Sequence, residues 1–143
     1  MKSVVRRFYR ELWEQSDFGR IGEILKEGVV FRGSLGDKKV GHAGFLSYQR
    51  KIHAALADYR CIEQSMVEDS NTVIAEMVFE GIHSKGPLRE FPPSGKKVSW
   101  RGFAKLQFQD GVIANVYVLG DEKGLEAQLR FNQTQSDTKQ SNL

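Results

Sequence analysis

The sequence has a single cysteine, Cys61, and only three prolines among its 143 residues. One cysteine cannot form a disulfide within the chain, and no pair of His or Cys residues has the spacing of zinc ligands. These absences argue against a disulfide-stapled secreted domain and give no support to a structural metal site. We therefore expect a chain from a reducing compartment, the cytoplasm, that folds by burying apolar side chains.

The sequence also lacks a long hydrophobic run and a block of like charge. Residues 1–12 place charged residues inside their apolar pattern, which is not typical of a signal peptide, and no other stretch reaches the length of a membrane span. The 21 Lys and Arg residues are scattered among 18 Asp and Glu residues, giving a formal net charge of +3. We expect neither a membrane nor a nucleic acid as a partner.

Three stretches in the first half of the chain have the spacing of amphipathic helices. The first covers residues 4–13, the second is shorter and can be capped by Asp17, and the third begins at Gly41. Their inward positions are Val4, Val5, Phe8, Tyr9, Leu12 and Trp13; Phe18, Ile21, Ile24 and Leu25; and Phe45, Gln49, Ile52 and Leu56. The pattern predicts three helices, with one short strand near residues 29–32 before the third.

The second half of the chain alternates with the period of β-strands. Strands are predicted from Tyr59 to Glu68, from Thr72 to His83, and on both sides of Asp110-Gly111. An Asp-Gly pair between two alternating runs favours a type I′ hairpin, because both central residues of that turn need positive φ. Helices followed by antiparallel strands predict an α+β fold.

The Asp-Gly turn also predicts a register for the last hairpin. In that register Gly102 pairs with Leu119 and Trp100 pairs with Asp121, all on one face of the sheet. Gly102 is small where Leu119 is large, which leaves room above the sheet. The sequence therefore predicts a pocket near Trp100 and Asp121.

The opposite face of this hairpin is more apolar than a face in contact with water should be. It carries Val98, Phe103, Val116 and Val118 among charged and polar residues. A second covering layer is implied. We expect a homodimer that forms through Phe103, Val116 and Val118.

The ends of the last two strands lead into less regular segments. Residues 84–96 hold all three prolines and form either a lid or an irregular crossing. A short helix is predicted from Glu122 to Leu129, followed by a polar stretch with few apolar residues. We expect one domain over residues 1–130 and a disordered tail over residues 131–143.

Four short motifs follow one another in the second half of the chain. They are Gly81-Ile82-His83, then Phe91-Pro92-Pro93-Ser94-Gly95-Lys96, then Asp110-Gly111-Val112-Ile113, and finally Asp121. In this order the sequence resembles the SnoaL-like polyketide cyclase family, whose members often read G-T-H, P-P-T-G-K, D-G-K-I and an Asp. The resemblance extends over nearly the whole chain and includes the helix that starts at Gly41.

This resemblance implies a fold like that of nuclear transport factor 2. In that fold a strongly curved, mostly antiparallel mixed sheet wraps around three helices to form a cone with an internal cavity, and a short helix follows. The family's cyclases close polyketide rings by an aldol step in which an aspartate, matching Asp121, acts as acid and base without metal or cofactor. Many relatives have E-H-W in the final strand. This chain has Asn115-Val116-Tyr117 there, so the second polar catalytic partner of those relatives is missing from that strand.

Each candidate site residue also has a structural alternative. Asp121 directly precedes the last predicted helix and can cap it. His83 ends a strand on the inward face, where it can protonate or orient a substrate oxygen or serve the structure alone. Arg32 can bind a carboxylate or an enolate, or reach solvent. Four further residues are expected either to line an apolar pocket or to form ordinary core: Trp100, Tyr117, Phe91 and Phe79.

Three functions are open at this point. A cofactor-free enzyme would carry out aldol cyclisation, isomerisation or hydrolysis on a small hydrophobic carbonyl compound: Asp121 would move a proton, His83 or Tyr117 would hold the oxygen, and Trp100 would keep the site dry. A non-catalytic module would bind a small hydrophobic ligand in the same cavity, with Asp121 only a helix cap. A dimerisation scaffold would have a collapsed cavity.

Overall fold

The structure is a computed structural model in which residues 1–141 are described, with side chains up to Gln135. In chain order the elements are α1 (Lys2–Arg7), the π-helix η1 (Phe8–Glu14), the 3-10 turn η2 (Ile21–Glu23), β1 (Leu25–Arg32), β2 (Lys38–Val40), α2 (Gly41–Ala55), β3 (Ala57–Asp69), β4 (Thr72–Ile82), β5 (Lys97–Gln109), β6 (Val112–Gly120) and α3 (Glu122–Ser141).

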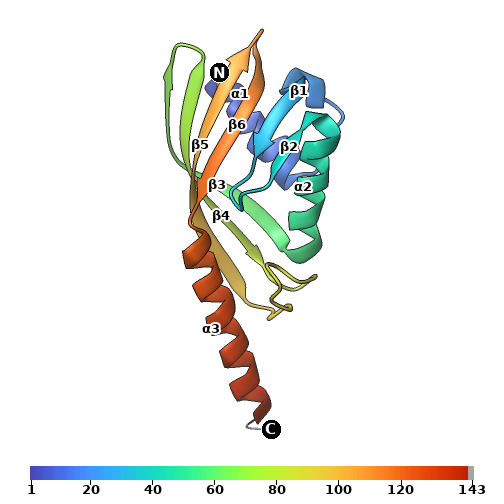
Figure 1. The fold of residues 1–143 in the computed structure, drawn as a ribbon, viewed down its shortest axis with the longest axis vertical. Helices are drawn as coiled ribbons and strands as arrows, with labels where there is room; N and C mark the ends of the chain where they lie inside the picture. The colour runs from blue at the N-terminus through green and yellow to red at the C-terminus, as the bar shows by residue number, and fades with distance from the viewer. Residues whose placement is uncertain (142–143) are drawn as a thin grey trace.

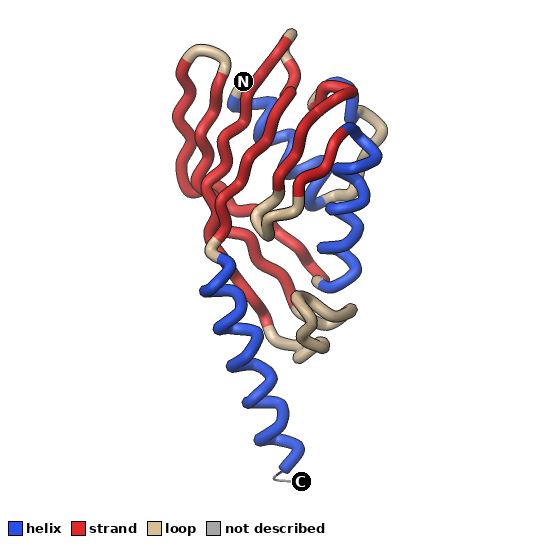
Figure 2. The backbone as a smooth tube through the Cα atoms, in the orientation of Figure 1, coloured by secondary structure: helices blue, strands red, loops and turns tan. Residues whose placement is uncertain are grey.

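The strands form one sheet of six, in the order β2-β1-β6-β5-β4-β3. Neighbouring strands are antiparallel except for β1 and β6, which run parallel. The sheet is curved, and α1, η1 and α2 lie against its concave side, while α3 leaves the end of β6 and projects beyond the sheet (Figures 1 and 2). This arrangement confirms the predicted α+β fold with a curved, mostly antiparallel mixed sheet.

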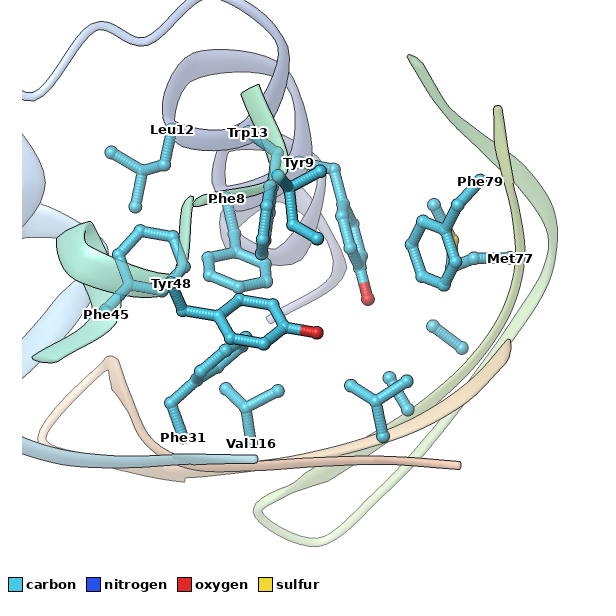
Figure 3. Packing of buried hydrophobic residues seen from close by; sticks show 14 of the residues in the cluster. Phe8, Tyr9, Leu12, Trp13, Phe31, Phe45, Tyr48, Met77, Phe79 and Val116 are labelled. Atoms are coloured by element: carbon cyan, nitrogen blue, oxygen red, sulfur yellow. The ribbon is translucent and has the colours of Figure 1, made fainter. Parts of the chain in front are cut away.

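The predicted apolar stripes of the first and third helices are the residues that pack into the sheet. Phe8, Leu12 and Trp13 of η1 are at most 5% exposed, as are Phe45 and Ile52 of α2. The inward positions of β4 are buried in the alternating pattern that the sequence predicts. The apolar faces of the helices and of the strands therefore pack together in one continuous core (Figure 3).

The predicted second helix is not formed. Between Asp17 and Leu25 the chain makes only the short turn η2, and Leu25 already belongs to β1. The Asp17 side chain accepts the N–H of Gly19 at 3.1 Å, which closes a local turn instead of capping a helix. Gly19 and Gly22 disfavour a helix in this stretch, because glycine loses more backbone freedom on ordering than other residues.

The predicted register of the β5–β6 hairpin is wrong beyond its first pairs. The Asp110-Gly111 turn is formed, with φ of 54° and 80°, and Phe108 pairs with Ile113 as predicted. Gln107 then pairs with Asn115, so one residue of β6 has no partner in the ladder. This bulge shifts the pairing by one residue and exchanges the two faces of β6.

The bulge changes which residues face outward. Val116 and Val118 point into the core and are at most 4% exposed. Val98 is buried for a different reason, since it shares the inward face of β5 with Trp100. Of the predicted outer residues only Phe103 lies outside, at 51% exposure, where it joins Tyr117 and Leu119. The apolar outer face thus exists, but its membership differs from the prediction.

The C-terminal helix is longer than predicted. It begins at Glu122, as expected, and continues past Leu129 to Ser141. The helix thus runs into the stretch of residues 131–143 for which the sequence predicts a disordered tail, and the last two residues lie outside the described part of the chain. The division into a domain of residues 1–130 and a tail stays a prediction.

Candidate functional site

The interior of the cone is lined by aromatic side chains from the helices and the sheet. They surround a hollow of only about 10 Å³, which has room for one water-sized group. Figure 3 shows these rings packed between η1, α2 and the sheet. The lining residues are Phe8, Tyr9, Trp13, Phe31, Ser34, Tyr48, Ile52, Tyr59, Phe79 and Val118.

The space that the sequence predicts above Gly102 is filled by a ring. A Cβ at Gly102 would lie 2.7 Å from Cε2 of Phe79, so the glycine allows the Phe79 ring to approach the backbone of β5. Gly33 serves Tyr48 in the same way, since a Cβ there would lie 2.3 Å from the Tyr48 ring. Gly102 and Gly33 therefore make room for aromatic rings that pack against them, and no pocket opens there.

The polar groups of the interior are neutral hydrogen-bonding groups. Burial raises the pKa of Tyr9, Tyr48 and Tyr59 and that of the Cys61 thiol, so all four keep their protons at neutral pH. The Tyr48 hydroxyl accepts the N–H of Leu35 at 3.1 Å, and the Tyr59 hydroxyl pairs with Cys61. Tyr9 differs from these, because its buried hydroxyl has no hydrogen-bond partner among the described residues.

A larger cleft, the mouth cleft, opens directly outside this interior. It has a volume of about 390 Å³, in the range of small-molecule sites. Its lining residues are Leu35, Asp37, Tyr48, Lys51, Ile52, Pro87, Leu88, Arg89 and Glu90. Tyr48 and Ile52 also line the inner hollow, so these two side chains separate the mouth cleft from the aromatic interior.

The rim of the mouth cleft is charged and tied to α3. Lys51 lies 3.4 Å from Asp37. Arg89 bonds Glu126 of α3 at 2.8 Å and lies 3.5 Å from Glu122. Arg89 and Glu90 form the tip of a tight turn with φ of 47° and 71°, a backbone region that non-glycine residues seldom adopt. This turn is held by paired backbone hydrogen bonds between Leu88 and Phe91.

Asp121 lies outside the cone. It is exposed, and its carboxylate accepts the N–H of Gly124 at 3.0 Å, which is the bond of a helix N-cap. Its backbone N–H bonds the carbonyl of Arg101, so Asp121 lies beside Arg101 and not opposite Trp100 as predicted. It borders an open depression of about 500 Å³ on the outer side of the sheet, whose lining also includes Trp100.

His83 is fully buried at the end of β4. Its Nε2 lies 2.8 Å from the carbonyl of Gly86, so Nε2 carries the proton and donates. Its Nδ1 is buried and has no partner in the described part of the chain. Burial lowers the pKa of His83. His83 therefore holds the start of the 84–96 connection, and it lines none of the cavities given above.

The remaining predicted site residues separate into inner and outer groups. Phe79 lines the hollow, and Trp100 packs against it with ring centroids 5.8 Å apart while donating to the Ser34 hydroxyl. The Arg32 guanidinium lies outside, 4.6 Å from the centre of the Tyr117 ring. Phe91 lies beneath Arg130 of α3, at 5.5 Å. The structure brings only Phe79 and Trp100 together at the interior.

The sequence prediction missed the tyrosines that give the interior its polarity. The helical spacing places Tyr9 among the inward positions of the first stripe without giving it a polar role, and Tyr48 lies one position outside the stripe predicted for α2. Both residues could have been found, because a tyrosine at a buried helix position carries its hydroxyl into the interior. In residues 1–141 no group of three or more His, Cys, Asp or Glu side chains could hold a metal ion, and no helix there is long and apolar enough to span a membrane.

Comparison with known proteins supports the same architecture. The family model described as SnoaL-like polyketide cyclase matches residues 3–129. No curated protein matches the chain. Solved structures with similar folds include a proposed polyketide cyclase from Acidithiobacillus ferrooxidans, with a TM-score of 0.80 and 20% identity over 92% of this chain and 94% of that one.

Two further solved structures are similar over most of their length. One is a SnoaL-like polyketide cyclase from Agrobacterium tumefaciens, with a TM-score of 0.73 and 21% identity over 90% of this chain and 96% of that one. The other is a Catenulispora acidiphila protein with a ketosteroid isomerase-like fold, with a TM-score of 0.71 and 12% identity over 87% and 90%. At these identities the likeness shows the fold alone, and it confirms the predicted fold class.

Proposed function

Because the chain belongs to the SnoaL-like polyketide cyclase family, we propose that it binds a small hydrophobic molecule between the mouth cleft and the aromatic interior. The observation that carries this proposal is the shared wall of the two spaces, formed by Tyr48 and Ile52. The mouth cleft has the volume for the body of such a ligand. The inner hollow can hold only a small group at one end of the ligand unless Tyr48 moves.

We infer that this binding is non-catalytic. The residues that line the hollow include no Asp, Glu or His, and their hydroxyl groups stay protonated at neutral pH. Proton transfer next to a carbonyl needs a group that both gains and loses a proton near neutral pH. Val116 and Val118 face the core from the final strand, which leaves that wall without an acid or base. Independence of cofactors and a cytoplasmic location stay predictions.

A fluorescence titration with 2-acetylnaphthalene tests the binding proposal. Leu35→Trp narrows the mouth cleft and should weaken binding by about tenfold or more, because 1.4 kcal/mol of lost contact changes affinity tenfold. Phe103→Ser, on the outer face, is the matched control and should bind as the wild type does. Equal loss in both variants, or no binding by the wild type, would overturn the proposal.

Acid/base catalysis at Asp121 is the second candidate function. It is supported by the family motif that ends at Asp121 and by the outer depression that Asp121 shares with Trp100. In this candidate Tyr117, which is exposed on the outer side of the sheet, would hold the substrate oxygen. His83, which the sequence also predicts for this role, is buried and lines neither the mouth cleft nor the outer depression. If Asp121 is the general base, Asp121→Asn should lower turnover of a small carbonyl compound by about 100-fold or more, while Asp110→Asn should not. Equal turnover by wild type and Asp121→Asn would reject this candidate.

We also propose that the protein forms a homodimer through the outer face of β5 and β6. The support is the exposure of three large apolar side chains there: Phe103 at 51%, Tyr117 at 47% and Leu119 at 60%. Phe103→Glu should then yield a monomer in sedimentation analysis. A wild-type mass that equals the monomer at every concentration would contradict the proposal.

A further inference from the structure

The Tyr9 hydroxyl is a hydrogen-bond donor placed deep in an apolar enclosure. The side chain is 5% exposed, and its ring packs against Phe8 and Phe79 with centroids 5.0 and 6.3 Å apart. Its oxygen is buried and has no hydrogen-bond partner among residues 1–141. Figure 3 shows the Tyr9 and Tyr48 hydroxyls pointing toward the middle of the cone. Tyr9 therefore presents its O–H to the inner hollow that it lines.

The other tyrosines of the chain do not share this situation. The Tyr48 hydroxyl accepts the N–H of Leu35, and the Tyr59 hydroxyl pairs with Cys61. Tyr117 is 47% exposed to water. Among the four tyrosines of the sequence, Tyr9 is thus the one whose burial leaves a polar group unsatisfied. Such a group destabilises the protein until an acceptor reaches it.

The surroundings of Tyr9 limit the acceptor to a neutral oxygen. Burial raises the pKa of Tyr9, so the hydroxyl stays protonated and can donate. The walls of the hollow carry no cationic side chain, and an anion there would lose its hydration without a charge partner. The hollow of about 10 Å³ admits a group the size of a single oxygen atom or water molecule.

We propose that Tyr9 is the anchor that determines ligand specificity, donating a hydrogen bond to the neutral carbonyl oxygen at the leading end of an otherwise apolar ligand. This inference rests on the proposed binding function. The ligand body occupies the mouth cleft, and its oxygen passes the wall formed by Tyr48 and Ile52 to reach Tyr9. A hydrocarbon of the same shape binds in the same place but leaves the Tyr9 hydroxyl unsatisfied.

Two nearly isosteric probes separate the hydrogen bond from the apolar contacts. The probe 2-acetylnaphthalene carries a C=O group where 2-isopropenylnaphthalene carries C=CH₂, and each is titrated against wild type, Tyr9→Phe and Thr72→Val. The wild type should prefer the ketone by about tenfold. Tyr9→Phe should remove this preference while its affinity for the hydrocarbon is unchanged. Thr72→Val removes a hydroxyl that bonds Asn71 beside the β3–β4 turn, away from the hollow and the mouth cleft, so this variant should keep the preference.

Stability of the free protein gives a second, independent readout. Tyr9→Phe removes an unsatisfied hydroxyl, so its urea midpoint should equal or exceed that of the wild type. A lower midpoint would show that the hydroxyl has a structural partner and would overturn the anchoring role. Binding of both probes with a ratio unaltered by Tyr9→Phe would overturn it too, while leaving the proposed function standing. Failure of the wild type to bind either probe would overturn both.

Discussion

Tyr9 and Asp121 lie on opposite sides of the same sheet, and their surroundings differ in polarity and in access to water. Tyr9 is enclosed by rings and offers a neutral hydroxyl to a hollow of about 10 Å³. Asp121 is exposed beside an open depression of about 500 Å³, where its carboxylate caps α3. The interior proposed to bind a ligand is thus neutral, while the carboxylate considered for proton transfer lies outside it. This separation favours binding over catalysis.

The largest effect should come from emptying the aromatic interior. The Trp13 ring contacts Phe31, Phe45 and Tyr48 with centroids 5.5 to 6.1 Å apart. Trp13→Ala should therefore lower the free energy of unfolding by about 3–5 kcal/mol, measured by urea denaturation. Phe131→Ala, at an exposed position of α3, should change it by less than about 0.5 kcal/mol. If both variants lowered the free energy of unfolding by similar amounts, the interior would not be packed more tightly than the exterior.

A smaller effect should follow from adding a methyl group inside the sheet. Gly102→Ala forces Phe79 to move, because the new Cβ would lie 2.7 Å from the ring. The expected loss is about 1–3 kcal/mol in unfolding free energy. Gly28→Ala, which would meet no atom within 4 Å, is the matched control and should be near neutral. If Gly102→Ala left the free energy of unfolding unchanged, Phe79 could move at little cost, and the interior could widen for a ligand.

Asp121 should behave as a cap in stability measurements. Asp121→Ala removes the acceptor of the Gly124 N–H and should cost about 1 kcal/mol in unfolding free energy. Asp121→Asn keeps a capping oxygen and should lie close to the wild type. If either variant instead raised the free energy of unfolding strongly, the Asp121 carboxylate would be destabilising the folded protein, as catalytic groups often do.

The smallest effect should be a change in pH dependence caused by His83. Burial lowers its pKa below the ordinary value of 6.5, so the unfolded chain takes up a proton more readily than the folded one. The contribution of His83 to stability is therefore complete above pH 6.5 and falls as the pH drops below it. His83→Gln should flatten the stability profile between pH 7 and 5. A difference between variant and wild type that is the same at both pH values would contradict this.

The fold could be predicted from the sequence where apolar and polar residues alternate clearly. Phe8, Leu12 and Trp13 mark one helical stripe, and the glutamates of β4 mark its outer face, so each element had one face to bury. Asp110-Gly111 identified the hairpin because few other pairs accept two positive φ values. These signals are local and predict single elements. The curved sheet was predicted only from the resemblance to the family motifs.

The site could not be predicted because its geometry depends on one extra residue. Both faces of β6 are apolar: Val116 and Val118 on one side, Tyr117 and Leu119 on the other. Alternation alone cannot choose between them, so the bulge after Phe108 was not visible in the sequence. Once the register shifts, Asp121 moves from Trp100 to the neighbourhood of Arg101, and the predicted pocket disappears. The mouth cleft also escaped prediction, because α2 and two separate loops build it.

The loop around the Leu88–Phe91 turn is also bonded to the last helix. Arg89 bonds Glu126 at 2.8 Å, and the Gln133 side chain holds the carbonyl of Pro92 at 2.6 Å. The positive φ values of Arg89 and Glu90 leave this turn little freedom to absorb movement by itself. A displacement of α3 would therefore either break these bonds or move the rim of the mouth cleft with it.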